Sequence, residues 1–252
     1  MRRTLMLASL VLAAAAVTPA ARLAAQAPRT GEALVEQMHA RYAGKWYRTL
    51  TFTQRTVRPG RPDQTWYEAA MIPGRLRIDI APVDSGNAAL YVGDSVYVFR
   101  GGQARPARAD RNLLMTLGFD VYGQAAATTV SQLRAEGIDL AKIRSDSWQG
   151  KPVWVVGADK GDSLSNQFWV EKGRLLFVRL IQHVPTQTGK ALLEAEFNQY
   201  QPLGGGWIAM NVIAKIDGKP IQEESYSDVK ADVALPDSLY TTGSYTRPSW
   251  VK

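Results

Sequence analysis

Short segments in which apolar and polar residues alternate occupy most of this 252-residue chain, and they constrain its fold more than any other feature. The clearest is Arg75–Ile80, where Leu, Ile and Ile alternate with Arg, Arg and Asp, so a strand here has one apolar and one charged face. Turns rich in Gly, Pro, Asp and Asn separate the segments, without intervening crossover helices. The pattern predicts a mainly antiparallel sheet of about eleven strands, with one side toward water.

The predicted strands fall into two runs along the chain. The first run comprises residues 48–55, 64–72, 75–80, 88–92 and 95–100. The pattern resumes at about Leu140 and continues through residues 152–158, 166–171, 175–183, 191–200, 207–216 and 220–229. Within the third strand we expect the charged side chains to face water, namely those of Arg75, Arg77 and Asp79.

Three helices are predicted beside these strands. Residues 32–42 form the first, because apolar residues recur at three- and four-residue spacing and Glu32 suits the positive end of the helix dipole. Between the strand runs, Asp110 can cap a short helix, and Thr128 or Thr129 can cap another. The two short helices carry the apolar residues Leu113, Leu114 and Leu117, and Val130 and Leu133, respectively. Neither is long enough to be stable alone, so both should lie on the sheet.

Residues 1–25 have the three regions of a removable export signal. Arg2 and Arg3 give a positive start, Leu5–Val17 is almost entirely apolar, and small residues follow around Pro19. The apolar run is too short for the roughly 20 residues that a membrane span needs, so cleavage near Gln26 is predicted rather than retention as an anchor. The mature protein is thus expected to be periplasmic and soluble.

Composition restricts what the mature chain can be. The formal charge is +7, and it falls to +4 when Arg2, Arg3 and Arg22 leave with the signal, which is too weak and dispersed to indicate nucleic-acid binding. There is no cysteine, so neither disulfides nor a lipid-modified cysteine can be present. Residues 26–252 are predicted to form one domain, with a tail from about residue 235 that covers an edge or hangs loose.

The sequence does not favour catalysis. Gly161-Asp162-Ser163-Leu164 has the signature of a serine esterase family, but it lies mid-chain between two predicted strands. Neither His39 nor His183 has the spacing of that family's base, and a serine without a base is a poor nucleophile. With no cysteine and two isolated histidines, no zinc-type ligand set exists, and no cofactor or metal is expected.

In its mature part the chain resembles the LolA/LolB superfamily, the periplasmic lipoprotein carrier and its outer-membrane receptor. The resemblance lies in the first helix and in the strand and turn patterns of residues 50–54, 72–79, 93–99, 167–171 and 175–180. It implies an unclosed antiparallel barrel whose apolar hollow has a lid of short helices and accepts acyl chains. It also implies a role in outer-membrane lipoprotein sorting or envelope lipid sensing.

One position departs from the carrier's pattern. In the carrier, an arginine directly before the turn proline bonds to the lid and helps to release cargo, whereas Ile72 stands here. The resemblance therefore supports the superfamily's fold better than the carrier's transfer cycle, and the chain is predicted to be a divergent member.

Two functions of different kinds remain open. The first is non-catalytic binding of lipid or lipoprotein acyl chains, with envelope membrane proteins as further partners. The second is an envelope interaction or scaffold protein whose barrel is filled by its own side chains. For the first, a cavity of several hundred Å³ is expected. Its predicted walls are Leu50, Phe52, Leu76, Ile78, Val96 and Val98, and its predicted lid is Leu113, Leu114 and Leu117.

Overall fold

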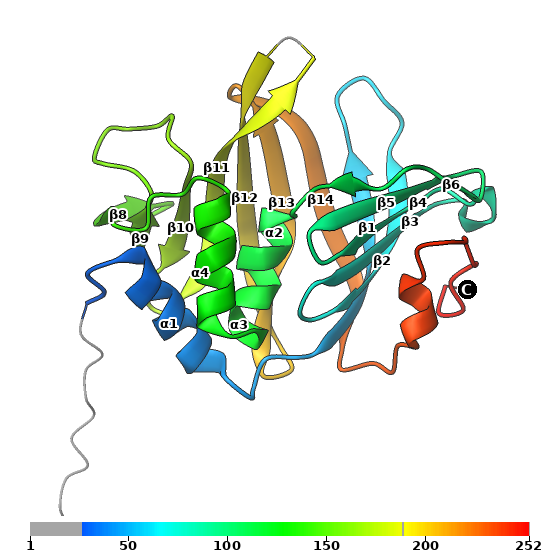
Figure 1. Cartoon of the computed structure of the whole chain (residues 1–252), viewed down its shortest axis with the longest axis horizontal. Coiled ribbons are helices and arrows are strands. Elements are labelled where there is room, and N and C mark those ends of the chain that lie inside the picture. Colours follow the sequence, from blue (N-terminus) through cyan, green and yellow to red (C-terminus); the bar gives the residue numbers. More distant parts are fainter. Residues whose placement is uncertain (1–26, 188, 252) are drawn as a thin grey trace, which may run out of the picture.

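A single antiparallel sheet of 14 strands curves around a group of short helices and remains unclosed (Figure 1). The computed structural model describes residues 27–187 and 189–251, so the predicted signal peptide lies outside the described residues. The strands are hydrogen-bonded in the order β6-β5-β4-β3-β2-β1-β14-β13-β12-β11-β10-β9-β8, and β7 pairs with β5. The predicted class, a mainly antiparallel and unclosed sheet with a helical lid, is confirmed.

The strands are β1 (Thr49–Val57), β2 (Gln64–Met71), β3 (Arg75–Ile80), β4 (Ala88–Val92), β5 (Ser95–Arg100), β6 (Gln103–Ala104), β7 (Arg108–Ala109), β8 (Ile143–Trp148), β9 (Lys151–Val156), β10 (Gln167–Glu171), β11 (Leu176–Thr186), β12 (Gly189–Leu203), β13 (Gly206–Ile216) and β14 (Lys219–Ala231). The predicted number, about eleven, was too low. The three additional strands are β6 and β7, with two residues each and thus no readable alternation, and β8 with its polar sequence.

The helical segments are α1 (Gly31–Tyr42), α2 (Leu113–Met115), η2 (Thr116–Asp120), α3 (Val121–Gly123) and α4 (Ala126–Ala135), with short turns η1 (Val83–Ser85) and η3 (Asp237–Tyr240). Thr30 caps α1, since its Oγ1 accepts a hydrogen bond from the Ala33 N–H at 3.2 Å. The cap of α2 is Asn112 rather than Asp110, because Asn112 Oδ1 accepts hydrogen bonds from the N–H groups of Leu114 and Met115.

The predicted caps of the second short helix were wrong as well. Helix α4 begins after Ala125, which has no side-chain cap, and both Thr128 and Thr129 lie inside the helix. Thr129 is fully buried, and its Oγ1 accepts a hydrogen bond from Gln124 Nε2 at 2.8 Å. The helix therefore begins before both threonines and lacks the side-chain cap that the sequence suggested.

The core lies between the concave face of the sheet and the helices. Helix α1 contributes Leu34, Val35 and Met38, which are all completely buried in it. Register explains which strand residues meet them, because Leu50 on β1 is opposite Ala70 on β2, and Ala70 is opposite Leu76 on β3. No helix among residues 27–187 and 189–251 is long and apolar enough to cross a membrane.

The convex face of β3 is not exposed as the alternation predicted. Arg77 is 2% exposed and Asp79 is 0% exposed, and Arg77 Nε lies 2.6 Å from Asp79 Oδ2. The guanidinium also donates to the carbonyl oxygens of Leu239 and Thr246, at 3.0 and 2.6 Å. The C-terminal segment thus lies across β3, β4 and β5 (Figure 1), and it covers a sheet face rather than hanging loose. Of the three charged side chains expected to face water, only that of Arg75 is substantially exposed.

Candidate functional site

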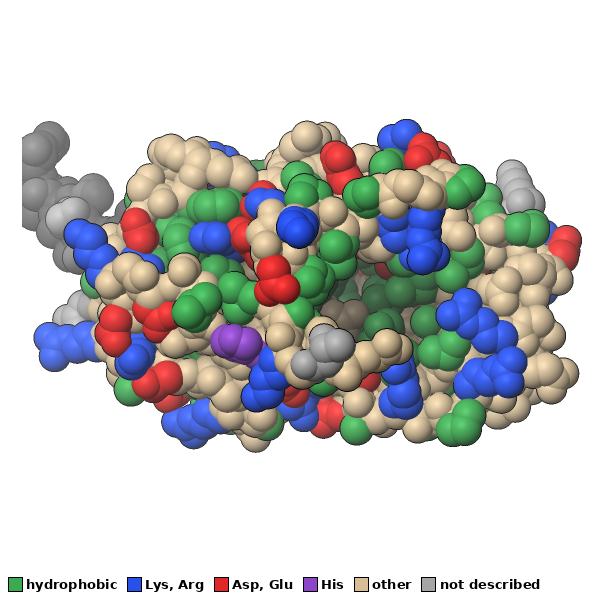
Figure 2. All heavy atoms as spheres, turned by 90° about the horizontal axis from the view of Figure 1, so that it is seen from above, with side chains coloured by type: hydrophobic (Ala, Val, Ile, Leu, Met, Phe, Trp, Pro, Cys, Tyr) green, Lys and Arg blue, Asp and Glu red, His purple; other side chains and the backbone are tan. Residues whose placement is uncertain are grey.

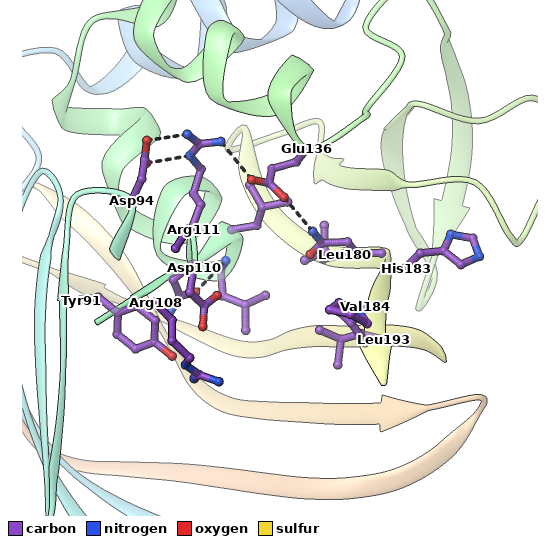
Figure 3. Close-up of a pocket in the computed structure, with 16 residues that line it drawn as sticks. Tyr91, Asp94, Arg108, Asp110, Arg111, Glu136, Leu180, His183, Val184 and Leu193 are labelled. Carbon is purple, nitrogen blue, oxygen red and sulfur yellow. Dashed lines mark hydrogen bonds and ion pairs between the residues drawn. The ribbon is translucent and has the colours of Figure 1, made fainter. Parts of the chain in front are cut away.

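An open cleft with a volume of about 710 Å³ lies beside α2. Figure 3 shows Tyr91 of β4 and Arg108 of β7 on one side of it, and Leu180, Val184 and Leu193 of β11 and β12 on the other. Leu113 and Leu114 of α2 also line the cleft. Seen from above, the molecule is hollowed, with hydrophobic side chains inside the hollow and Lys and Arg side chains around it (Figure 2). The cleft is therefore partly apolar and has a charged margin.

Arg111 joins the elements that border this cleft. Its Nη2 lies 2.6 Å from Asp94 Oδ2 in the β4–β5 turn, and its Nη1 lies 2.9 Å from Glu136 Oε1 at the end of α4. Glu136 Oε2 in turn accepts a hydrogen bond from Gln182 Nε2 of β11 at 3.2 Å (Figure 3). The hydrogen bonds from Arg111 lower the pKa of Asp94, so this carboxylate stays ionised. Since Arg111 directly precedes the cap of α2, the ion pairs hold that helix against both sides of the cleft.

A smaller inner hollow of about 100 Å³ lies under α2 and η2. It adjoins the cleft, because Asn112 and Leu114 line both. The sheet supplies its other walls through inward-facing residues of β1, β2, β3, β12, β13 and β14. These wall residues are Phe52, Trp66, Glu68, Ala70, Leu76, Ile78, Phe197, Val212, Glu224 and Tyr226, and Met115 and Phe119 complete the lining.

The nine residues predicted for the cavity occupy three kinds of position. Phe52, Leu76, Ile78 and Leu114 line the inner hollow together, and Leu113 lines the cleft with Leu114. By contrast, Leu50, Val96 and Leu117 are packed by their neighbours, with exposed fractions of 0, 2 and 0%. Val98 is half-buried opposite Ala89 and does not line either cavity.

Two glutamates of the hollow were missed from the sequence. Glu68 lies opposite Phe52 and Ile78 in the sheet register, which directs its side chain inward, and it is 6% exposed. Glu224 lies opposite Thr56 and Val212 on the same concave face. Burial raises the pKa of Glu68 well above its usual range, and the nearby carboxyl of Glu224 raises it further. The pairing of the strands shows that both side chains point inward. The sequence alone does not, because the alternation of apolar and polar residues around Trp66–Ala70 is weak.

Burial also raises the pKa of Glu224, although hydrogen bonds to its carboxyl oppose this effect. Its Oε1 accepts from Gln222 Nε2 at 2.6 Å, and its Oε2 accepts from the Tyr226 hydroxyl at 2.7 Å. Two carboxyls therefore face an otherwise largely apolar and aromatic space. When that space is empty, burial favours their neutral forms.

The residues considered for catalysis and metal binding have structural surroundings. Ser163 lies in the loop between β9 and β10, where Asp162 accepts hydrogen bonds from Ser165, and these lower the pKa of Asp162 to about 2. His183 lines the margin of the cleft, with its Nδ1 at 3.2 Å from Asn166 Oδ1. Across the described ranges, no group of three or more His, Cys, Asp or Glu side chains is placed to hold a metal ion.

Comparison with known proteins identifies the fold. No protein-family model matches the sequence, and no curated protein sequence matches it either. Among solved structures, a LolA superfamily protein from Nitrosomonas europaea is similar at 17% identity, with a TM-score of 0.50, over 84% of this chain and 97% of that one.

Two further solved structures share the architecture. A putative outer membrane lipoprotein-sorting protein domain from Vibrio parahaemolyticus is 14% identical with a TM-score of 0.53, over 84% of this chain and 96% of that one. A DUF1329 family protein from Desulfovibrio piger is 14% identical with a TM-score of 0.52, over 84% of this chain and 95% of that one. The chain therefore has a LolA-like fold, as its resemblance implied.

Proposed function

We propose that this protein binds acyl chains of lipids or lipoproteins without catalysing a reaction, in outer-membrane lipoprotein sorting or envelope lipid sensing. The observation that carries this proposal is the open, partly apolar cleft of about 710 Å³ in a LolA-like fold, adjoining an inner hollow. Its volume lies within the range of roughly 300–1,000 Å³ that is typical of small-molecule sites. The lipoprotein-sorting description of the Vibrio parahaemolyticus structure agrees with this role.

Leucines from both the lid and the sheet supply the surface for such a chain. Leu114, Val184 and Leu193 line the cleft and are partly exposed, whereas Leu113 and Leu180 lie in its wall with exposed fractions of 3 and 1%. Each methylene group buried there contributes about 0.8 kcal/mol, so several together would hold a chain without any charged contact. The inner hollow, at about 100 Å³, accommodates only one end of a ligand while α2 stays in place.

The predicted site residues divide accordingly. Phe52, Leu76 and Ile78 would contact the part of the ligand that enters the hollow. Leu113 and Leu114 would contact the part in the cleft. Leu50, Val96, Val98 and Leu117 do not line either space, so their contact with a ligand would require the lid to move.

The proposal is tested with a fluorescent fatty acid. Wild-type protein should bind the probe saturably, and Ile78→Asn should weaken binding at least tenfold, since it places an amide among Phe52, Leu76 and Leu114. Leu164→Asn is the matched control, because Leu164 is 64% exposed in a surface loop, and it should leave binding unchanged.

Absence of binding to wild-type protein would favour the alternative, an envelope interaction or scaffold protein with a filled barrel. The packing of Leu50 and Leu117 at 0% exposure is the observation on the side of that alternative. We also propose export to the periplasm, with the mature chain starting near Gln26. N-terminal sequencing of periplasmic protein checks this, and an intact Leu5–Val17 segment in the membrane fraction would contradict it.

A further inference from the structure

We propose that the inner hollow binds an organic cation, the amine or ammonium group of an amphiphile, between the carboxylates of Glu68 and Glu224 and the aromatic rings around them. This inference rests on the proposed function, because it assumes that the rest of the amphiphile occupies the cleft. It specifies the ligand's polar end, which an acyl-chain site leaves undetermined.

Glu68 is the first observation behind this assignment. Its side chain lines the hollow, it is 6% exposed, and in the part of the chain that the structure describes it has neither a hydrogen-bond partner nor an ion-pair partner. An unpartnered buried carboxyl normally costs stability, and most buried polar groups in proteins are therefore satisfied. A hollow with room for several water molecules lies in front of this carboxyl, and a ligand group can satisfy it there.

Glu224 is already arranged as an acceptor. Gln222 Nε2 and the Tyr226 hydroxyl donate hydrogen bonds to its carboxyl, and the side chain of Gln54 also hydrogen-bonds to it. Donors on both oxygens favour the ionised form of a carboxyl, although burial opposes it here. The positive charge that would complete such a site is missing from the lining of the hollow.

The other ionisable groups around the hollow do not supply that charge. Lysine, arginine and histidine are absent from its lining, and the overlying α2 and η2 contribute Asn112, Leu114, Met115 and Phe119, which are uncharged. The nearest ionisable neighbours are tyrosines: Glu68 raises the pKa of Tyr91 and Tyr200 raises that of Tyr226, while Arg108 and Asp110, which line the cleft, act on Tyr91 in opposite directions. On the convex face, in contrast, Glu194 and Glu196 pair with Arg179 and Lys215, respectively. The protein thus neutralises that carboxylate pair itself, whereas the inner pair has no ion-pair partner among the described residues. The Arg58 guanidinium, 5.6 Å from the Trp66 ring centroid, donates a hydrogen bond to Gln64 instead.

Aromatic side chains supply the remaining walls of the site. Five of them line the hollow, namely Phe52, Trp66, Phe119, Phe197 and Tyr226, and the Phe52 and Tyr226 ring centroids are 4.4 Å apart. Ring faces attract cations, and ammonium groups are characteristically bound in such aromatic cages. A neutral carbonyl or hydroxyl end can form hydrogen bonds with the carboxyls, but it lacks the positive charge that the ring faces and an ionised carboxylate attract.

Binding of a cation between the two carboxyls should be coupled to release of protons from them. In the empty hollow, burial raises the pKa of both carboxyls, and the carboxyl of Glu224 raises that of Glu68 further. A bound ammonium group lowers the pKa of both, so a carboxyl that is protonated in the empty hollow releases its proton to solvent when the cation enters. Affinity for the cation should therefore rise with pH, while affinity for a neutral amphiphile should not.

The test compares decylammonium with decanol, which share a chain and differ at the polar end. Binding to full-length mature protein is measured by titration calorimetry, at low salt, at pH 6 and pH 8. We expect decylammonium to bind at least tenfold more tightly than decanol at pH 8, with a smaller difference at pH 6. The proton release should appear as a heat of binding that depends on the buffer's ionisation enthalpy.

The variants separate the carboxyls from the fold. Glu68→Gln/Glu224→Gln keeps the size and the neutral state of both side chains, so it should fold, bind decanol as wild type does, and lose the preference for decylammonium. For Glu68→Gln alone, the logarithm of the ratio between the dissociation constants of decanol and decylammonium should fall to half of its wild-type value or less. Glu223→Gln, on the opposite face of β14, is the matched control and should behave as wild type.

The outcomes distinguish this inference from the proposed function. Equal binding of decanol and decylammonium, or a preference that survives in the double variant, overturns the cation site and leaves chain binding intact. Failure of both probes to bind overturns the cation site, and together with a failed fatty-acid titration it overturns the proposed function too.

Discussion

At the residue scale, the ion pairs of β3 differ in burial, and the buried pair should contribute more to stability than the exposed one. Arg77 and Asp79 form an ion pair under the C-terminal segment, with exposed fractions of 2 and 0%, whereas Arg75 and Asp237 pair at the surface. The difference in burial should be visible in stability. Removing one partner of a buried pair leaves an uncompensated charge, while an exposed pair contributes little.

Asp79→Asn should therefore lower the free energy of unfolding by about 3–5 kcal/mol, because it leaves the Arg77 guanidinium buried without its counter-charge. Asp237→Asn, which breaks the exposed pair with Arg75, should change it by less than about 1 kcal/mol. Urea denaturation of both variants measures the difference. Equal effects would show that the C-terminal segment does not seal the Arg77 site.

Asp120 gives a prediction about pH. Burial raises its pKa to about 7, although a hydrogen bond from the Gly74 N–H at 3.1 Å opposes the shift. Because the folded pKa lies above the unfolded value, the folded state binds more protons, and stability should fall as pH rises from about 4 to 7. Asp120→Asn removes this titration. Its free energy of unfolding relative to wild type should rise between pH 5 and pH 8 by more than about 1 kcal/mol, as measured by denaturation at each pH. A difference that is independent of pH would contradict this account.

Single residues also show where sequence reasoning stops. Alternation assigned Leu76 and Ile78 to the inner face and Arg77 and Asp79 to the outer one, but it carries no information about what covers each face. The covering segment lies some 160 positions further along the chain, at Leu239 and Thr246. Glu68 was missed for a related reason, since its inward direction follows from pairing with Phe52 and Ile78 rather than from its neighbours in sequence.

At the element scale, α2 lies between the cleft and the hollow, since Leu114 lines both. The helix continues without a break through η2 and α3 to Gly123, and a segment this short depends on contacts with other elements for its stability. The ion pairs of Arg111 with Asp94 and Glu136 supply two such contacts from opposite sides of the cleft. Sequence patterns located this lid through Leu113, Leu114 and Leu117. Its cap at Asn112 is a local contact that the choice of Asp110 overlooked, whereas the ion pairs of Arg111 depend on long-range contacts.

Arg111→Ala should loosen the lid. Losing two partly buried ion pairs of roughly 0.2–1 kcal/mol each should increase amide hydrogen exchange in residues 113–115 by about threefold or more. Arg105→Ala, at an exposed position in the same connection, is the control and should leave this exchange unchanged. Exchange followed by mass spectrometry measures both. Unaltered exchange in the Arg111 variant would mean that apolar packing alone holds α2.

At the scale of the whole molecule, the fold could be predicted and the shape of its interior could not. About eleven strands and the helical interruption follow from periodicity and turns, because these are local properties of sequence, whereas the unclosed barrel was implied by the resemblance to the LolA/LolB superfamily. Cavity shape depends instead on how well side chains pack, and a few of them decide it. Leu50 and Leu117 fill space that the sequence suggested as open, and the larger open volume lies nearer β11 and β12.

The central claim, that this LolA-like protein carries a lipid in its cleft and hollow, is tested most directly by native mass spectrometry. Protein purified from the periplasm without detergent should show a second mass series, displaced from the apo protein by the mass of one lipid or acyl-bearing molecule. Ile78→Asn protein prepared in the same way should show mainly the apo series, and Leu164→Asn should match wild type. A wild-type spectrum with the apo series alone, together with no uptake of added fatty acid, would contradict the account.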